Sequence, residues 1–362
     1  MNERLSKLTD RLIGREWQGV IIYSPENRYY FSKYRGTAGM LVIQSGSQKL
    51  ITDFRYVDQA KAQASDFDVL QHQQNMVELV CDQFSHLKRG VVGLEFGAVP
   101  VEIYLELKER LPQIEFVDCS EVTNAIRSIK DEEEIESIAK GIEICDQAFA
   151  HILTFIEPGK TEKEIGLELE LFMKKAGAEG IKANHVIASG PRASLPHGQA
   201  TDRVLEVGDF LKMDYGAIVN GYISDFTRTV VLGPPTEKQL KIYSIVRKAQ
   251  EESLKIIGPG VRCCDVDDVG RSIIADAGYG PNFGHSLGHS LGLFIHESPA
   301  LRSTDQTILQ PGMVITVEPG IYIPGWGGVR IEDLLVITED GYRNLTTSTK
   351  DLQIINVREE VH

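Results

Sequence analysis

The sequence predicts an α+β protein with two domains, a smaller α/β N-terminal domain (residues 1–126) and a larger C-terminal domain (residues 127–362). The chain has 362 residues, and a single hydrophobic core rarely grows beyond about 250–300 residues. In the first part, apolar runs typical of strands alternate with segments that have helical spacing. From residue 184 onward, strand-like runs dominate. These observations favour an α/β unit followed by a domain rich in antiparallel strands.

The N-terminal domain is predicted to contain both strands and helices. Amphipathic helices are expected at residues 5–15 and 101–110, where apolar residues recur at helical spacing. The predicted strands are residues 19–23, 40–43, 49–52 and 91–94. Residues 40–43 and 49–52 should form a hairpin, because only a short polar segment with a glycine separates them.

The C-terminal domain is predicted to open with a long helix at residues 131–156, which begins with acidic residues and continues with isoleucines at helical spacing. The segment 157–160 contains Pro158 and Gly159 and should end this helix. Thr161 and Glu164 then have the spacing of a capping box for the next helix. Further helices are expected near residues 237–257 and 265–277.

Composition and charge narrow the possible classes of function. The net charge of −14 disfavours a nucleic-acid partner, because phosphate binding needs clustered Lys and Arg. No apolar run approaches the roughly 20 residues that span a bilayer, and the charged N-terminus lacks the apolar core of a signal peptide. The five cysteines are scattered, as is typical of reduced thiols in the cytosol. We therefore expect a cytoplasmic protein without a membrane or nucleic-acid partner.

The first group of candidate functional residues lies in residues 209–233, where two strand-like runs flank Asn220-Gly221. This dipeptide is a strong signal for a two-residue β-hairpin turn. Such a turn pairs Asp214 with Thr227, so that Asp214 and Asp225 share one face as diagonal neighbours. Two carboxylates in a partly buried site repel each other, and a divalent cation would remove this repulsion. A solvent-facing hairpin with incidental acids is the alternative.

The second group lies in residues 283–299, which contain His285, His289 and His296. Glycines within this segment disfavour a helix. No second histidine follows His296-Glu297 at the spacing that the helical HExxH zinc motif requires. Glycine also lets the backbone approach a ligand closely. We interpret the segment as part of a binding site, with structural histidines as the alternative.

Two later strands carry further acids. Residues 313–318 are predicted to form a strand that ends in Glu318, and residues 329–338 a strand on which Arg330 and Glu332 share one face if it is regular. An exposed ion pair is the alternative for Arg330 and Glu332. Four carboxylates and one imidazole form a ligand set that suits two divalent ions such as Mn²⁺, Co²⁺ or Zn²⁺. Paired metals of this kind support hydrolysis.

The order and spacing of these residues resemble the pita-bread metallopeptidase family, which includes aminopeptidase P, prolidase and methionine aminopeptidase. The resemblance rests on Asp214 with Asp225 eleven residues later, and on the segments HSLGLFIHESP, VEPG, VRIED and ASGPRASLPHG. Residues 1–126 resemble the smaller N-terminal domain of aminopeptidase P, prolidase and creatinase. The resemblance implies a C-terminal pita-bread domain with an antiparallel sheet, two divalent metal ions per subunit (foremost Mn²⁺, with Co²⁺ or Zn²⁺ as alternatives) and a homodimer.

The resemblance also implies a role for each candidate residue. The implied metal ligands are Asp214, Asp225, His289, Glu318 and Glu332. Asp225 and Glu332 would bridge the two ions, and Arg330 would orient Asp214. The family usually has a glycine after the ligand histidine, whereas this chain has Ser290.

The implied catalytic residues are His197, His296 and Glu318. A metal-bridging hydroxide would attack the scissile carbonyl, with Glu318 as the proton acceptor. His296 would stabilise the oxyanion, and His197 would contact the substrate near the scissile bond. His285 and Tyr322 would shape the pocket for proline.

The resemblance implies hydrolysis of the bond between an N-terminal residue and a following proline in short peptides. We expect an Xaa-Pro aminopeptidase, with an Xaa-Pro dipeptidase (prolidase) as the alternative. A strict dipeptidase must bind the free carboxylate of its proline, usually with an arginine. Here the first basic residue after the HESP segment is Arg302, two residues beyond Ala300. Tripeptides should then be better substrates than dipeptides, unless Arg302 or Arg192 supplies the missing charge.

Three other functions are weaker alternatives. Methionine aminopeptidases usually lack an N-terminal domain like residues 1–126. A creatinase-like amidinohydrolase acts without metal and lacks the full ligand set. Inactive relatives that serve as binding modules have lost ligands as well. Because all five ligand positions are occupied here, the last two alternatives are disfavoured.

Overall fold

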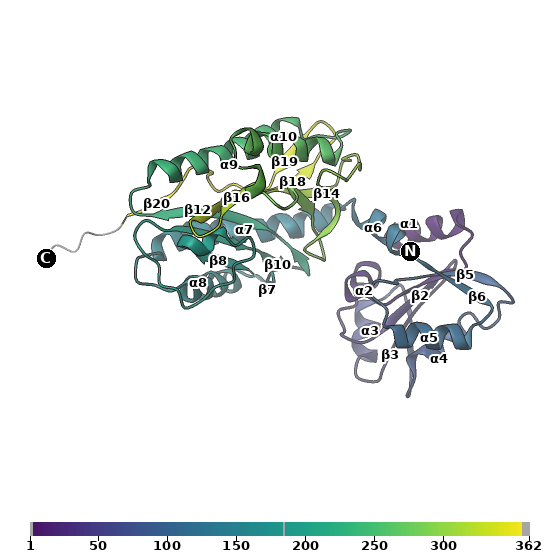
Figure 1. Ribbon diagram of the computed structural model, residues 1–362. Coiled ribbons are helices and arrows are strands. Elements are labelled where there is room, and N and C mark those ends of the chain that lie inside the picture. The colour runs from purple at the N-terminus through teal and green to yellow at the C-terminus, as the bar shows by residue number, and fades with distance from the viewer. Residues whose placement is uncertain (1–2, 184, 357–362) are drawn as a thin grey trace. The chain divides into compact units, whose positions relative to one another are not determined.

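The computed structural model describes residues 3–183 and 185–356, which belong to two units, Met1–Arg127 and Ser128–His362. Both units combine helices with sheets (Figure 1). This arrangement confirms the predicted α+β fold with an α/β unit at the N-terminus. Among the described residues, no helix combines the length and the apolar character that crossing a membrane requires. All five cysteines are free thiols.

The first unit is built on a six-stranded mixed sheet in the order β4-β3-β2-β1-β5-β6. Its strands are β1 (Gly19–Ile22), β2 (Met40–Gln44), β3 (Ser47–Thr52), β4 (Asp68–Gln71), β5 (Gly90–Leu94) and β6 (Ile114–Asp118). Its helices are α1 (Glu3–Gly14), α2 (Pro25–Ser32), α3 (Val57–Gln63), α4 (Met76–Asp82), α5 (Val101–Arg110) and α6 (Ser120–Arg127). The predicted hairpin is formed by β2 and β3, and Gly46 in its turn has φ +80°.

The second unit contains four antiparallel or mostly antiparallel sheets. A four-stranded sheet has the order β20-β12-β9-β8, a five-stranded sheet the order β14-β13-β15-β18-β19, and smaller sheets the orders β11-β10-β7 and β16-β17. The strands up to the first hairpin are β7 (Gly180–Ile181), β8 (Val186–Ser189), β9 (Phe210–Tyr215), β10 (Ala217–Val219), β11 (Tyr222–Ile223) and β12 (Phe226–Leu232). The later strands are β13 (Gly288–Ser290), β14 (Glu297–Leu301), β15 (Val314–Val317), β16 (Gly320–Ile323), β17 (Gly327–Arg330), β18 (Asp333–Ile337), β19 (Tyr342–Asn344) and β20 (Ile354–Ile355).

Helices cover these strands on two sides (Figure 1). They are α7 (Glu132–Phe155), α8 (Glu162–Lys175), α9 (Glu237–Ile256) and α10 (Cys263–Asp276), with short 3₁₀ segments at Gly190–Ser194 and Gly280–Asn282. Helices α7 and α8 pack against β7, β8, β10 and β11, whereas α9 and α10 pack against β14 to β17. The predicted capping box of Thr161 and Glu164 is present at the start of α8. The strands between the two helix layers carry the candidate functional residues.

The hairpin around Asn220-Gly221 has the predicted register. Val219 pairs with Tyr222 in the β10–β11 turn, and the same register continues into β9 and β12, where Asp214 pairs with Thr227. Asn220 has φ 51° and Gly221 has φ 80°, as a type I′ turn requires at both central residues. The turn therefore determines which face of the hairpin carries Asp214.

The single strand predicted for residues 329–338 is wrong. The chain forms two strands instead, because β17 pairs with β16 whereas β18 pairs with β15 and β19. Ile331 and Glu332 lie at the change of sheet. Glu332 donates its backbone N–H to the carbonyl of Thr227 at 3.2 Å. The break thus brings Glu332 to the hairpin that carries the two aspartates.

Candidate metal centre

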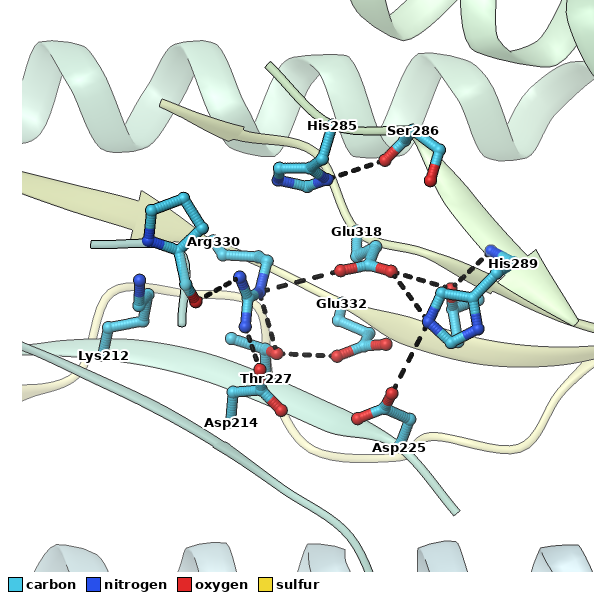
Figure 2. Close-up of polar contacts among 12 residues, drawn as sticks. Lys212, Asp214, Asp225, Thr227, His285, Ser286, His289, Glu318, Arg330 and Glu332 are labelled. Atoms are coloured by element: carbon cyan, nitrogen blue, oxygen red, sulfur yellow. Dashed lines mark hydrogen bonds and ion pairs between the residues drawn. The ribbon is translucent and has the colours of Figure 1, made fainter. Parts of the chain in front are cut away.

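Five side chains from four separate parts of the second unit converge on one point (Figure 2). Asp214 lies on β9, and Asp225 directly precedes β12 on the other arm of the hairpin. The remaining three are His289 on β13, Glu318 directly after β15, and Glu332 between β17 and β18. Carboxylate oxygens of Asp214, Asp225 and Glu332 lie within 4.8 Å of one another. The structure therefore gathers the predicted ligands at one site.

Electrostatics favour a cation at this point. Burial and the neighbouring Asp225 carboxylate raise the pKa of Glu332 well above its usual range. Burial also raises the pKa of Asp225, although Lys182 acts in the opposite direction. The Oε1 atom of Glu332 is buried and has no hydrogen-bond partner among the residues that the structure describes. A crowded set of acids with a free acceptor atom suits a divalent cation, which supplies the missing positive charge.

His289 and Glu318 form the other side of the centre. The Nε2 atom of His289 lies 3.2 Å from Oε1 of Glu318 and 3.7 Å from Oδ2 of Asp225. Burial acts to raise the pKa of Glu318, but the hydrogen bond with His289 and the charges of His289, Arg330 and His285 together outweigh this effect and lower the pKa. An imidazole and carboxylates in this arrangement suit Mn²⁺, Co²⁺ or Zn²⁺. The donor set therefore fits the predicted metal ions.

A close approach of two strands explains the glycine before His289. A Cβ atom at Gly288 would lie 1.9 Å from the carbonyl oxygen of Thr316 on β15. The hydroxyl of Thr316 accepts a hydrogen bond from the backbone N–H of His289 at 3.0 Å and donates one to Glu318 at 3.2 Å. Gly288 thus allows β13 to place His289 beside Glu318.

Arg330 holds Asp214 in place. Its Nη2 atom donates to Oδ2 of Asp214 (Figure 2). Its Nη1 atom donates to the hydroxyl of Tyr322 at 3.0 Å. The side chain is 3% exposed, so water does not compete for these contacts. The sequence-based interpretation of an exposed ion pair with Glu332 is excluded, because Arg330 is buried and bonds Asp214 instead. A buried guanidinium with two fixed partners restricts the orientation of the carboxylate.

The metal centre opens into a cavity of about 1380 Å³. Asp214, Asp225, His289 and Glu318 line it, together with the predicted catalytic and binding residues His197, His285 and His296. The imidazole of His296 lies edge-on to that of His289, with 4.6 Å between ring centroids. Tyr322 is buried beside the cavity, and its hydroxyl is hydrogen-bonded to His285 Nε2 at 2.9 Å. The structure thus groups all the predicted histidines around one cavity.

Ser290, the departure from the family pattern, has a buried partner. Its hydroxyl accepts a hydrogen bond from the ammonium of Lys130 at 3.0 Å. Lys130 also pairs with Glu297 at 3.3 Å. Ser290 therefore belongs to a polar contact that joins β13 to the residue following His296, and it does not enter the metal centre.

Lys182 is a residue of the site that the sequence analysis missed. It follows β7 and is 6% exposed, and its ammonium donates to one oxygen each of Asp214 and Asp225. Burial acts to lower its pKa, but the two carboxylates outweigh this effect and raise the pKa. The sequence around Lys182 gives no signal of this contact, because the two aspartates lie 32 and 43 residues away along the chain.

Arg228 connects the metal centre to the rest of the unit. It is 1% exposed and donates to the carbonyl oxygen of Glu332 and, at 2.9 Å, to the carboxylate of Asp333. We predict that Arg228→Met lowers the free energy of unfolding by roughly 3–5 kcal/mol, because it leaves a buried carboxylate without one of its cations. Thermal unfolding would measure the loss. Arg343→Met at an exposed position of β19 is the control, and an equal Tm for both variants would contradict the prediction.

Comparisons with known proteins agree with this geometry. The model for metallopeptidase family M24 matches residues 136–339, and the model for the creatinase/prolidase N-terminal domain matches residues 4–129. The chain is 39% identical to an Xaa-Pro dipeptidase of Pyrococcus furiosus, over 97% of this chain and 100% of the relative.

Solved structures of Xaa-Pro peptidases have the same fold as this chain. A structure described as an Xaa-Pro dipeptidase from Bacillus anthracis has a TM-score of 0.93 at 40% identity, covering 97% of this chain and 99% of that one. An X-Pro aminopeptidase from Thermotoga maritima has a TM-score of 0.90 at 36% identity, with the same coverage of both chains. The fold and the two-domain organisation are therefore shared over nearly the whole length.

Proposed function

The chain belongs to metallopeptidase family M24, and from this premise we propose that it is an Xaa-Pro dipeptidase with two divalent metal ions. The family membership makes it a metallo-exopeptidase and confirms the resemblance seen in the sequence. The observation that supports the finer proposal is the cavity, in which four of the five candidate ligands lie together with His197, His285, His296 and the cationic side chain of Arg302. A homodimer and Mn²⁺ as the resident metal remain predictions.

The ligands are proposed to be the five predicted residues. Asp214, Asp225 and Glu332, whose carboxylate oxygens lie close together, would hold the two ions together with His289 and Glu318. When bound, paired metals supply an activated water near neutral pH and polarise a carbonyl group. Arg330 would keep Asp214 in a ligating orientation through its buried contact.

The other roles follow from position in the cavity. Glu318 is deprotonated and adjoins His289, so it is placed to accept a proton from the attacking water. Burial, followed by the neighbouring His289, lowers the pKa of His296, which is therefore a neutral N–H donor near pH 7. It would donate to the developing oxyanion. His197 would contact the substrate near the scissile bond, and His285 with Tyr322 would contact the proline ring.

Dipeptides are proposed as the preferred substrates, in place of the tripeptides that the sequence analysis favoured. The relatives named Xaa-Pro dipeptidase support the alternative. Arg302 lines the cavity and is exposed to it, so it can bind the proline carboxylate. Arg192 is unsuitable, because its guanidinium is bonded to the buried Glu162 and, at 2.8 Å, to the carbonyl of Gln199. Arg302, two residues beyond Ala300, therefore provides a cation in the cavity.

Removing Arg302 tests this proposal. Arg302→Ala should lower kcat/KM for an Xaa-Pro dipeptide on the order of 10-fold to 100-fold, because a charge-assisted hydrogen bond to the carboxylate is lost. The matching Xaa-Pro amide lacks that charge, so its kcat/KM should change little. Steady-state kinetics with Mn²⁺ on both substrates give the comparison.

The control is Arg343→Ala, at an exposed position outside the cavity, which should behave like the parent protein. If the parent protein cleaves Xaa-Pro-Yaa tripeptides better than the dipeptides, and Arg302→Ala affects both substrates alike, the enzyme is an aminopeptidase and the dipeptidase proposal is wrong. If no proline substrate is cleaved by a protein that carries metal, proline specificity itself is wrong.

A further inference from the structure

Lys182 occupies a position within the metal centre where a cation would be expected. Its ammonium donates to Oδ1 of Asp214 and to Oδ1 of Asp225, and its charge also interacts with Glu332. These oxygens belong to the candidate ligands. An ammonium and a metal ion cannot occupy the same point between them, so the two cations compete for one position.

The side chain is held there by its surroundings. The backbone N–H of Lys182 donates to the carbonyl of Gly216 at 2.8 Å. A Cβ atom at Gly216 would lie 3.2 Å from Cδ of Lys182, so the aliphatic stem passes over the hairpin beside this glycine. Because the residue is 6% exposed, the ammonium cannot exchange its carboxylate partners for bulk water without leaving the site.

The other side of the centre remains available to a metal. His289, Glu318 and Oδ2 of Asp225 lie away from the contacts of Lys182. Oε1 of Glu332, which is 1% exposed as a residue, has no hydrogen-bond partner. An imidazole with several carboxylate oxygens is a sufficient ligand set for one divalent ion.

Charge balance distinguishes the two positions. When all four carboxylates of the centre are deprotonated, as metal ligands are, they carry four negative charges, and the buried cations Lys182 and Arg330 balance two of them. One divalent ion neutralises the remainder. A second divalent ion would leave an excess of positive charge in a buried site, which is costly unless the ammonium moves away.

We propose that the ammonium of Lys182 occupies one of the two cation positions, so that one divalent ion binds tightly beside His289 and the second binds only by displacing Lys182. This inference rests on the proposed two-metal site. If so, the second divalent ion binds only when the concentration of free metal is high enough to displace the Lys182 ammonium. Lys182 therefore sets the metal concentration at which the second position is filled.

Metal titration of metal-free protein tests the inference without any measurement of activity. Isothermal titration with Mn²⁺ at one fixed pH should give two Kd values for the parent protein, the second at least tenfold weaker. In Lys182→Met, the second Kd should tighten at least tenfold. After desalting, elemental analysis should find about one Mn²⁺ per subunit in the parent protein and about two in Lys182→Met.

Two control variants show whether a change in Kd comes from the lost charge of Lys182 or from damage to the fold. Lys182→Arg keeps a cation and should retain the weak second site. Lys163→Met removes a lysine outside the centre, whose ammonium pairs with the exposed Asp202 at 2.9 Å, so it should leave both Kd values unchanged. Thermal unfolding in the presence of Mn²⁺ verifies that Lys182→Met is folded.

The possible failures are distinguishable. If the parent protein and Lys182→Met bind two Mn²⁺ with the same affinities, the role of Lys182 is wrong while the two-metal site stands. If a folded parent protein and a folded Lys182→Met both bind no Mn²⁺, Co²⁺ or Zn²⁺, the proposed metal site is wrong, and the inference is wrong with it.

Discussion

Replacing Asp225 by Asn is expected to abolish peptidase activity and to release metal. Asp225 contributes one oxygen on the side of Lys182 and the other, 3.7 Å from His289 Nε2, on the opposite side. A neutral amide cannot bridge two cations from this position. The loss of several kcal/mol of transition-state stabilisation corresponds to a fall in kcat/KM on the order of 10³-fold or more. Kinetics and elemental analysis of the same preparation measure both effects.

The matched control is Asp202→Asn, an exposed carboxylate that pairs only with Lys163 among its charged partners in the described residues. It should retain activity and metal. In the parent protein, a chelator should remove activity and Mn²⁺ or Co²⁺ should restore it. Full activity of Asp225→Asn, or of parent protein shown to contain no metal, would contradict the two-metal proposal.

Replacing His296 by Ala is expected to lower kcat on the order of 10²-fold to 10³-fold while both metals remain bound. The imidazole lines the cavity beside His289, at 4.6 Å between ring centroids. It is proposed as a donor to the developing oxyanion and not as a ligand, so its loss should remove a hydrogen bond and leave the metal in place. Removing one such donor costs about this much in kcat. Because the interaction forms chiefly in the transition state, KM should change little.

Metal content separates a catalytic role from a ligand role for this histidine. His296→Ala should carry as much Mn²⁺ as the parent protein, and His86→Ala, an exposed histidine of the first unit, should match the parent protein in both measurements. A His296→Ala protein that has lost metal would identify His296 as a ligand. An unchanged kcat with full metal content would exclude it from the transition state.

Local sequence signals determined a large part of this structure. The Asn220-Gly221 turn accepts positive φ at both residues, and this alone sets the register that pairs Asp214 with Thr227. The capping box at Thr161 likewise defines where α8 begins. Such features depend on residues within a few positions of one another, so they can be predicted without knowledge of the fold.

The break between β17 and β18 could not be predicted in this way. The run VRIEDLLVIT is apolar enough for one continuous strand. Its two halves pair with different sheets, and the carbonyl of Thr227 on β12 binds the N–H of Glu332 at the break. Thr227, which fixes the conformation at this break, lies about a hundred residues from Glu332, so no local sequence pattern can predict the break.

The candidate ligands of the metal centre could be predicted from the sequence, because the order and spacing of Asp214, Asp225, His289, Glu318 and Glu332 resemble one family. The proposed roles of two cationic side chains, those of Lys182 and Arg302, could be inferred only from the tertiary structure. Lys182 is separated from Asp214 and Asp225 by 32 and 43 residues, and Arg302 reaches the cavity only because β14 passes along its wall. A lysine or arginine is compatible with many positions on a surface or in a site. Its long side chain acquires a function only when packing brings a particular carboxylate, or a substrate's carboxylate, within its reach.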